Sequence, residues 1–321
     1  MINITLDDIR NTAEKNKEVH RTPVFASTTL SDQTGIEVCF KAENLQKAGA
    51  FKIRGALNAV RSLSDEEKAR GVITYSSGNH AQATALAAAL EGINCIVVMP
   101  EDVREVKKQG ARSYGAAIEL AGYTTEDRRK RAMELKEQHG YTVIPPYDDP
   151  RIITGQGTVA LEVLEQVSDL DYILAPIGGG GLISGIALAT KLINPKIKVI
   201  GVETEGADDA KRSFEQGEII RLDTVETIAD GIRSLCVGDL NFEVIRQYVD
   251  DIVTIPDERI LQMMRFFFER MKLVVEPTGA VASGALLEHS QRFQGAKVCS
   301  IISGGNIGVE QFAEMLVKEK A

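Results

Sequence analysis

The sequence predicts an α/β protein with mainly parallel sheets, on three observations. Short β-rich runs alternate with helical patterns along almost the whole chain. Several of these runs are continuously apolar, which is typical of strands covered by helices on both faces. Neither an internal repeat nor a low-complexity linker interrupts the alternation. Strands that alternate with helices are joined by right-handed crossovers, and such crossovers build parallel sheets.

The expected strands are short runs of β-branched and other apolar residues, bounded by turn-forming or charged residues. In chain order they cover residues 36–43, 71–75, 95–100, 141–146, 172–178, 197–203 and 298–304. Helical patterns lie between them and cover residues 51–63, 80–92, 125–140 and 181–193. Helix-end signals support the third helix, because Thr124 and Asp127 stand at its start and Gly140 at its end.

The chain of 321 residues suggests roughly two domains, at about 150 residues each. Because no linker divides the sequence, we expect the second domain to be an insertion into the first. Residues 71–140, with three strand–helix units, are expected to form a small inserted α/β domain. Residues 1–70 and 141–321 are expected to form the large domain.

The composition excludes several classes of partner. Lysine and arginine total 37 and aspartate and glutamate total 46, so the net charge is −9, which disfavours binding to nucleic acids or anionic membranes. The first residues lack the layout of a signal peptide, and no apolar run approaches the roughly 20 residues of a membrane helix. Four histidines without paired spacing argue against a histidine metal site. We expect a cytoplasmic protein with buried thiols at four separate positions, Cys39, Cys95, Cys236 and Cys299.

Four consecutive glycines follow an apolar strand in residues 176–185 and open a helix. Such a run costs backbone entropy, which a plain turn would rarely spend on four residues. Residues without side chains let backbone N–H groups approach an anion at a helix N-terminus. The spacing matches neither GxGxxG nor GxxxxGK[ST]. The run therefore predicts a phosphate site for a cofactor other than NAD or ATP.

Two further motifs point to chemistry beside this phosphate. Ser76, Ser77, Asn79 and His80 crowd the start of a helix, where one cap residue would suffice, and together they suit a bound carboxylate. Lys52 stands in an apolar setting that would lower its pKa and make its amine nucleophilic. Alone, such a lysine usually extends to solvent. Together with a phosphate site, a lysine imine is what pyridoxal phosphate requires.

Five motifs, AFKIRGA, SSGNHAQ, GQGT, GGGGL and SGGN, follow one another in this order. The set resembles the fold-type II pyridoxal-phosphate enzymes, and among them the serine racemase and threonine (serine) dehydratase family. The resemblance spans residues 22–306. It implies a tryptophan synthase β-like fold, with two open, twisted, mainly parallel sheets that carry helices on both faces. We also expect a homodimer.

The resemblance implies how the cofactor is held. Lys52 would be the Schiff-base lysine and the base that takes the Cα proton. Asn79 would bond the 3-hydroxyl, Phe51 would pack near the ring and Ser303 would face the pyridine nitrogen. A serine there makes the ring a weaker electron sink, which suits β-elimination. The remaining cofactor residues would be Gly178, Gly179, Gly180, Gly181 and Leu182 at the phosphate and Glu276 near the ring.

The substrate would be bound by residues of three separate segments. By the same resemblance Ser76, Ser77, Asn79 and His80 would hold its carboxylate. Ser77, opposite Lys52, would also be the second acid/base that inversion at Cα needs. Residues on the side of the substrate would be Arg128, Asp230 and Ser234.

A cation site is implied by Glu203, the carbonyl of Ala207 and Asp209. Carboxylate and carbonyl oxygens suit Mg²⁺ or Ca²⁺, and the alternative is an acidic surface turn. A nucleotide site is matched only in part. Lys47, Gln82 and Tyr114 agree with the ATP site of racemases, but Ala48 replaces a threonine there, which argues against an ATP effector.

The sequence therefore predicts a pyridoxal-phosphate-dependent ammonia-lyase. It would convert L-serine or L-threonine by β-elimination into a 2-oxo acid and ammonia, with serine racemase activity in addition. The enzymatic alternative is a 3-hydroxyaspartate ammonia-lyase, which needs a further cation for the second carboxylate of its substrate. Outside enzymes, the alternative is a module that binds a phosphorylated metabolite.

Overall fold

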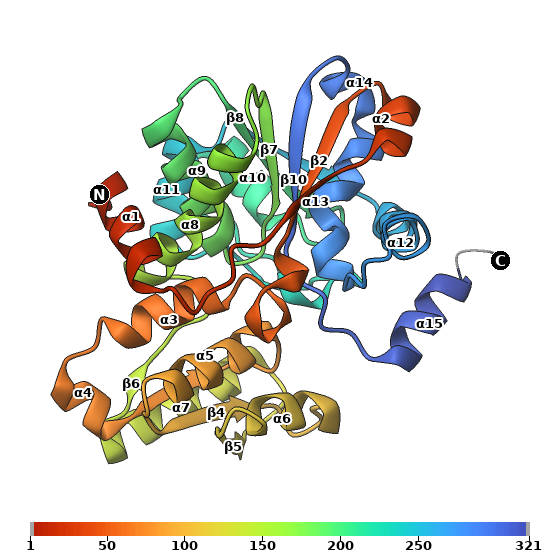
Figure 1. The fold of residues 1–321 in the computed structure, drawn as a ribbon. Coiled ribbons are helices and arrows are strands. Elements are labelled where there is room, and N and C mark those ends of the chain that lie inside the picture. The colour runs from red at the N-terminus through yellow and green to blue at the C-terminus, as the bar shows by residue number, and fades with distance from the viewer. Residues whose placement is uncertain (1–2, 319–321) are drawn as a thin grey trace.

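The computed structural model describes residues 3–318, which contain two β-sheets (Figure 1). The six-stranded sheet has the order β1-β2-β10-β7-β8-β9, and all its strand pairs are parallel except β1 with β2. The four-stranded sheet has the order β5-β4-β3-β6 and is parallel throughout. The predicted α/β class with mainly parallel sheets is confirmed.

The strands of the large sheet are β1 (Val24–Ala26), β2 (Glu37–Ala42), β10 (Lys297–Ile302), β7 (Tyr172–Pro176), β8 (Lys198–Thr204) and β9 (Asp251–Ile255). Those of the small sheet are β5 (Ala117–Leu120), β4 (Cys95–Met99), β3 (Val72–Tyr75) and β6 (Thr142–Val143). Three of them, β1, β5 and β9, are missing from the predicted set. Each lies at the edge of its sheet, where one side of the strand is unpaired and a continuous apolar run is not required.

The four predicted helices are present as α3 (Ile53–Arg61), α5 (Asn79–Leu90), α7 (Thr125–His139) and α9 (Gly181–Ile193). Helix α7 starts with the expected capping box, formed by Thr124 and Asp127, and ends at left-handed Gly140. The other helices are α1 (Leu6–Lys15), α2 (Thr28–Thr34), α4 (Asp65–Arg70), α6 (Glu105–Arg112), α8 (Pro150–Gln166), α10 (Asp209–Gln216), α11 (Asp239–Tyr248), α12 (Asp257–Phe266), α13 (Pro277–Glu288), α14 (Ser290–Phe293) and α15 (Val309–Lys318). Within residues 3–318, no helix has the length and apolarity to cross a membrane.

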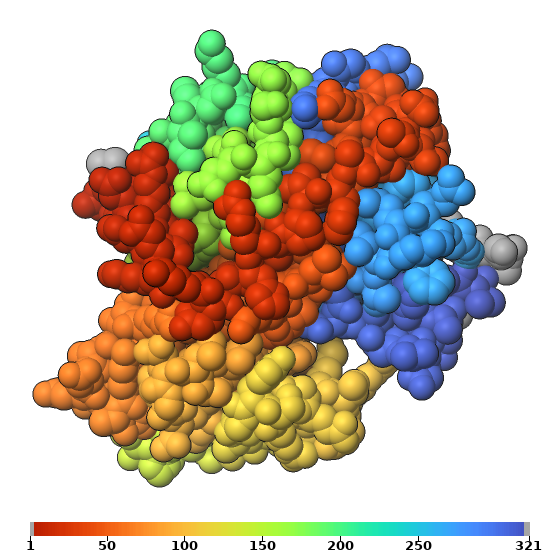
Figure 2. Space-filling model, in the orientation of Figure 1, coloured from red at the N-terminus to blue at the C-terminus, as the bar shows by residue number. Residues whose placement is uncertain are grey.

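The two sheets correspond to two lobes. In Figure 2 the orange-to-yellow lobe at the bottom contains the small sheet, and the rest of the chain forms the upper lobe. Strand β6 pairs with β3 inside the small sheet, although the expected boundary at residue 140 gave it to the large domain. The boundary shifts because β6 covers the edge of β3 that β4 leaves open. We propose that the lobes are domains and that the small one includes β6.

Helix α3 joins the lobes. Its apolar residues Ile53, Leu57 and Val60 belong to the hydrophobic core that packs under the small sheet, together with Val72 and Val97. Among the thiols, Cys39, Cys95 and Cys299 are buried as expected. Cys236 is only half-buried, because it lies in the loop before α11 rather than in a strand.

Four of the five predicted motifs follow carboxyl ends of parallel strands, whereas GQGT lies within α8. The lysine segment comes after β2, the four glycines after β7 and the SGGN motif after β10, all in the large sheet. The serine-rich motif comes after β3 in the small sheet. In open parallel sheets these ends form the ligand-binding crevice.

Candidate active site

The four-glycine run connects β7 to α9, and its backbone leaves no room for side chains. Gly180 is the N-cap of α9 and lies in the left-handed region, with φ at 95°. A Cβ atom on Gly179 would come within 2.3 Å of the Tyr147 ring, and one on Gly180 within 2.8 Å of Asn241 Cβ. The first N–H groups of a helix have no partner inside it, and such groups bind phosphate. This turn contains the predicted phosphate residues Gly178, Gly179, Gly180, Gly181 and Leu182.

Lys52 is the N-cap residue of α3. The residue as a whole is half-buried, but its amine lies inside the protein. Nζ donates a hydrogen bond of 2.8 Å to the Pro146 carbonyl and lies 5.1 Å from the centroid of the Phe51 ring. Burial lowers the pKa of Lys52 to about 8. The amine is therefore uncharged, and nucleophilic, at a lower pH than a hydrated lysine would be.

Asn79 lies in a chain of three side chains. Its Nδ2 donates to Glu276 Oε1 over 2.6 Å, and its Oδ1 accepts from Asn306 Nδ2 over 2.8 Å. Burial, followed by the charge of Asp230, raises the pKa of Glu276 to about 8. Asn79 Nδ2 has a second hydrogen and Asn79 Oδ1 a second lone pair, so both atoms remain able to bond a ligand.

His80 is buried beside the lysine. Its Nε2 lies 3.0 Å from the Ile144 carbonyl, and its Nδ1 is buried without a partner in the described structure. Burial, and secondarily the charge of Lys52, lowers the pKa of His80 to about 3, so the ring is neutral. A substrate carboxylate would therefore meet a neutral imidazole.

The serine hydroxyls of the same motif lie at the start of α5. Ser76 Oγ accepts from the Gly78 N–H over 3.3 Å. Arg128 Nη1 donates to Ser77 Oγ over 3.4 Å, and its Nη2 donates to Thr125 Oγ1 over 2.6 Å. The Nε of Arg128 is buried without a partner in the described structure, and burial lowers the pKa of this guanidinium. The structure thus brings Arg128 to Ser77, and its place on the side of the substrate stays a prediction.

Ser303 joins the end of β10 to the lysine segment. Its Oγ donates to the Thr278 carbonyl over 3.2 Å, and its own carbonyl accepts from the Phe51 N–H over 3.2 Å. An isolated bridge between Ala50 and Gly304 strengthens this junction. The buried Ser303 residue is therefore bonded directly to the segment that carries Lys52.

Asp230 and Ser234 lie together on the loop before α11. Asp230 is exposed and forms an ion pair of 2.8 Å with Lys107 of α6, which links the two lobes. Its negative charge contributes, after burial, to the raised pKa of Glu276. Ser234 is half-buried, and its N–H donates to the Ile232 carbonyl over 2.7 Å.

The predicted cation ligands surround the turn between β8 and α10. Glu203, Ala207 and Asp209 are all buried, which rules out a solvated acidic turn. The N–H groups of Ala210 and Lys211 donate to Glu203, whereas neither oxygen of Asp209 has a partner in the described structure. Burial raises the pKa of Asp209 to about 7 and that of Glu203 well above its usual value. Two buried carboxylates, one of them unpaired, fit a bound divalent cation.

This cation site has few acidic ligands of its own. Within the described residues, no three His, Cys, Asp or Glu side chains gather as metal ligands anywhere. The Ala207 carbonyl would therefore have to complete the two carboxylates.

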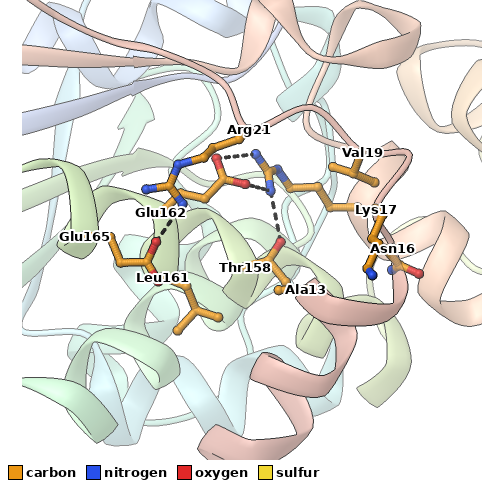
Figure 3. A pocket seen from close by; sticks show the side chains of 10 residues that line it. Ala13, Asn16, Lys17, Val19, Arg21, Thr158, Leu161, Glu162 and Glu165 are labelled. Carbon is orange, nitrogen blue, oxygen red and sulfur yellow. Dashed lines mark hydrogen bonds and ion pairs between the residues drawn. The ribbon is translucent and has the colours of Figure 1, made fainter.

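A separate pocket of about 200 Å³ lies between α1 and α8 (Figure 3). In its wall Arg54 bonds Glu162 and Thr158, and Arg21 bonds Glu165. None of the predicted site residues lines this pocket. Two ion pairs, Arg21 with Glu165 and Arg54 with Glu162, line the pocket together with Lys17, and the candidate active site lies elsewhere.

Three residues near the glycines were missed by the sequence analysis: Tyr147, Asp148 and Asn241. Tyr147 packs on Gly179, and burial raises the pKa of Tyr147 to about 12. Asp148 and Asn241 bond each other across 93 residues of sequence. No local pattern marks them, because their role appears only when α11 lies beside the glycine turn.

A lysine with a depressed pKa beside a phosphate turn, at the carboxyl ends of two parallel sheets, defines a class of enzymes that bind pyridoxal phosphate covalently. Residues 16–304 match the family model described as "Pyridoxal-phosphate dependent enzyme", and the chain belongs to this family. The resemblance inferred from the five motifs is confirmed, and so is the enzyme class.

Individual relatives cover nearly the whole chain. The chain is 45% identical to an L-threo-3-hydroxyaspartate ammonia-lyase of Saccharomyces cerevisiae, over 98% of this chain and 97% of that protein. It is 43% identical to a serine racemase of Schizosaccharomyces pombe, over 97% of each chain. The structure of maize serine racemase is similar with a TM-score of 0.93 and 42% identity, over 98% of both chains. The processed form of threonine deaminase isoform 2 from Solanum lycopersicum gives a TM-score of 0.94 at 33% identity, over 98% of this chain and 86% of that one.

Proposed function

We propose that this pyridoxal-phosphate enzyme is an ammonia-lyase for L-serine and L-threonine, with serine racemase activity. The observation that carries the proposal is the buried Lys52 amine, which bonds the Pro146 carbonyl next to Tyr147, the residue that packs on the glycine turn. The glycine turn fits the phosphate, because it opens α9, and the first N–H groups of a helix have no partner inside it. Bound pyridoxal phosphate supplies an electron sink that acidifies the Cα proton of an amino acid.

Different residues of this chain would bind the cofactor, bind the substrate and move the Cα proton. Lys52 binds the cofactor through its amine and takes the Cα proton. Asn79 would bond the ring oxygen of the cofactor, and Ser303 would face its ring nitrogen. Ser76, Ser77, Asn79 and His80 hold the substrate carboxylate. A hydroxyl at Ser303 cannot keep the ring nitrogen charged as a carboxylate would, which favours expulsion of a β-hydroxyl.

The other parts of the proposal concern the surroundings of the reaction. Glu203, the Ala207 carbonyl and Asp209 would hold Mg²⁺ or Ca²⁺ as a structural ion. The enzyme would be a cytoplasmic homodimer that acts on small hydroxy amino acids. Relatives of this chain include proteins named serine racemase and L-threonine ammonia-lyase, which supports both activities.

A 3-hydroxyaspartate ammonia-lyase is the second candidate, and Arg128 favours it. Its guanidinium reaches Ser77, and its buried Nε has no partner in the described structure. An unpaired donor of this kind suits the second carboxylate of such a substrate. Two relatives with 45% and 46% identity are named L-threo-3-hydroxyaspartate ammonia-lyase.

One assay decides between these candidates. The purified protein is given L-serine, L-threonine and L-threo-3-hydroxyaspartate in parallel, and ammonia, 2-oxo acid and residual enantiomers are measured. We expect ammonia from serine and threonine, and D-serine from L-serine. Release of ammonia from L-threo-3-hydroxyaspartate alone would identify the protein as the second candidate. Arg128→Ala should then raise KM for that substrate selectively. A colourless protein without any product would refute the enzyme proposal.

A further inference from the structure

The Gly179 carbonyl is held from behind by two donors. The Gly238 N–H donates to it over 3.1 Å and Asn241 Nδ2 over 2.9 Å. A trans peptide unit is planar, so its C=O and the following N–H point in opposite directions. A carbonyl of Gly179 fixed toward α11 therefore turns the Gly180 N–H away from α11, toward the open side of the turn.

Asn241 is itself held rigidly. It is fully buried, and its carbonyl accepts from Ser184 Oγ of α9 over 3.3 Å. Asp148 Oδ1 accepts from the Leu240 N–H, the Asn241 N–H and Asn241 Nδ2 over 3.0, 3.2 and 3.3 Å. One carboxylate oxygen thus caps the N-terminus of α11 and fixes the Asn241 side chain at the same time.

Asp148 also connects this arrangement to the lysine. Two residues before it, the Pro146 carbonyl accepts from Lys52 Nζ. Between them, Tyr147 packs its ring on Gly179 and its backbone against Gly181. Residues 146–148 therefore contact both the lysine and the glycine turn, and the side chain of Asp148 reaches the element behind that turn.

We propose that Asn241 and Asp148 are positioning residues of the phosphate site. Asn241 fixes the Gly179–Gly180 peptide so that the Gly180 N–H faces the cofactor phosphate, and Asp148 fixes Asn241. This inference rests on the proposed function, because it takes the glycine turn to bind the phosphate of pyridoxal phosphate.

The test compares two ligands that differ only in the phosphate. Apoprotein of the wild type, Asn241→Ala and Asp148→Ala is titrated with pyridoxal phosphate and with pyridoxal, and binding is followed by visible absorbance. Both variants should weaken the binding of pyridoxal phosphate by about tenfold or more, because a buried hydrogen bond is lost. Binding of pyridoxal, which has no phosphate, should change less than about threefold, since the lysine remains in place.

Asp148→Ala is the more decisive variant, because an effect of its charge and an effect of its position would change phosphate binding in opposite directions. If only charge mattered, removal of an anion near the turn would strengthen binding of the phosphate. If Asp148 positions the turn, its removal weakens that binding. Asp149→Ala is the matched control, since Asp149 caps α8 instead, through the Arg151 N–H over 2.8 Å. This control should leave the ratio of the two affinities at the wild-type value.

The results distinguish a failure of the positioning role from a failure of the phosphate assignment. Equal weakening of both ligands, or tighter pyridoxal phosphate in Asp148→Ala, would overturn the positioning role. A wild type that binds pyridoxal as tightly as pyridoxal phosphate would instead refute the phosphate assignment and with it the proposed function. If Asn241→Ala does not fold, the affinity ratio of Asp148→Ala decides alone.

Discussion

Burial, more than any neighbouring charge, sets the chemistry of Lys52. Its pKa falls from 10.5 to about 8 through desolvation, and within residues 3–318 its amine bonds an uncharged carbonyl. The charged amine is penalised and the neutral amine is not. The fraction of nucleophilic amine therefore rises with pH around a midpoint well below that of an exposed lysine.

The first prediction follows from that pKa. The rate at which apoprotein takes up pyridoxal phosphate should rise with pH and level off above a midpoint near 8. Stopped-flow absorbance across this range measures the midpoint, and borohydride followed by peptide mass analysis should place the label on Lys52. A midpoint close to the ordinary value of 10.5, or label on another lysine, would contradict this assignment.

Ser77 is the residue at which racemisation and elimination should separate. Inversion needs a proton on the face of Cα opposite Lys52, and acid/base help of this kind contributes about 10²–10⁴-fold in rate. Ser77→Ala should reduce L-serine racemisation by such a factor and leave L-threonine dehydration largely intact, with a raised KM. Chiral chromatography and a 2-oxo acid assay on the same samples measure both. Equal loss of both activities would make Ser77 a substrate anchor only.

Among individual residues, the sequence marks the candidate reactive groups but not the side chains that bond them. Lys52, Asn79 and the glycines are recognisable because each lies in a dense local motif. Glu276 was placed near the cofactor, yet its bond to Asn79 spans 197 residues of sequence and no local spacing encodes it. The Arg128 contact with Ser77 likewise depends on where α7 lies over β3.

Among the elements, the turn from β8 into α10 buries two acidic side chains, which destabilises the fold unless a cation binds them. Asp209 and Glu203 are buried acids, and neither Asp209 oxygen has a partner in the described structure. A ligand that binds only the native state stabilises it by mass action.

Chelation should therefore lower the melting temperature, and Mg²⁺ or Ca²⁺ should restore it. Asp209→Asn removes one charge at constant shape, so this variant should melt at a temperature that chelator no longer changes. Differential scanning fluorimetry with and without EDTA measures both effects. A wild type whose melting temperature ignores excess chelator would show that these acids serve another purpose.

In the molecule as a whole, a buried ion network fastens α3 to the large lobe. Arg54 is 2% exposed and bonds Glu43, after β2, and Glu162 of α8. The apolar side of the same helix packs under the small sheet. The network therefore helps to fix the relative position of the lobes, and with it the position of Lys52 at the start of α3.

Glu43→Gln should destabilise the protein by about 3–5 kcal/mol, because removal of one partner leaves the other charge buried. The exposed pair of Arg21 and Glu165 is the control, and Arg21→Ala should cost less than about 1 kcal/mol. Urea unfolding followed by circular dichroism gives both values. Equal small losses would mean that water reaches Arg54 in solution.

The class of fold, the central strands and the cofactor were predictable from the sequence, and the residues expected to meet the cofactor stay a prediction. These features are visible in short stretches of sequence: continuous apolar runs, consecutive glycines and a lysine in an apolar motif. The edge strands, the place of β6 in the small sheet and the partners that hold the reactive groups became visible only in the folded chain. Asp148 and Asn241 are 93 residues apart, and Asn241 and Gly179 are 62 apart. Such bonds form only after the sheets have brought distant loops to one crevice, so no pattern along the chain marks them.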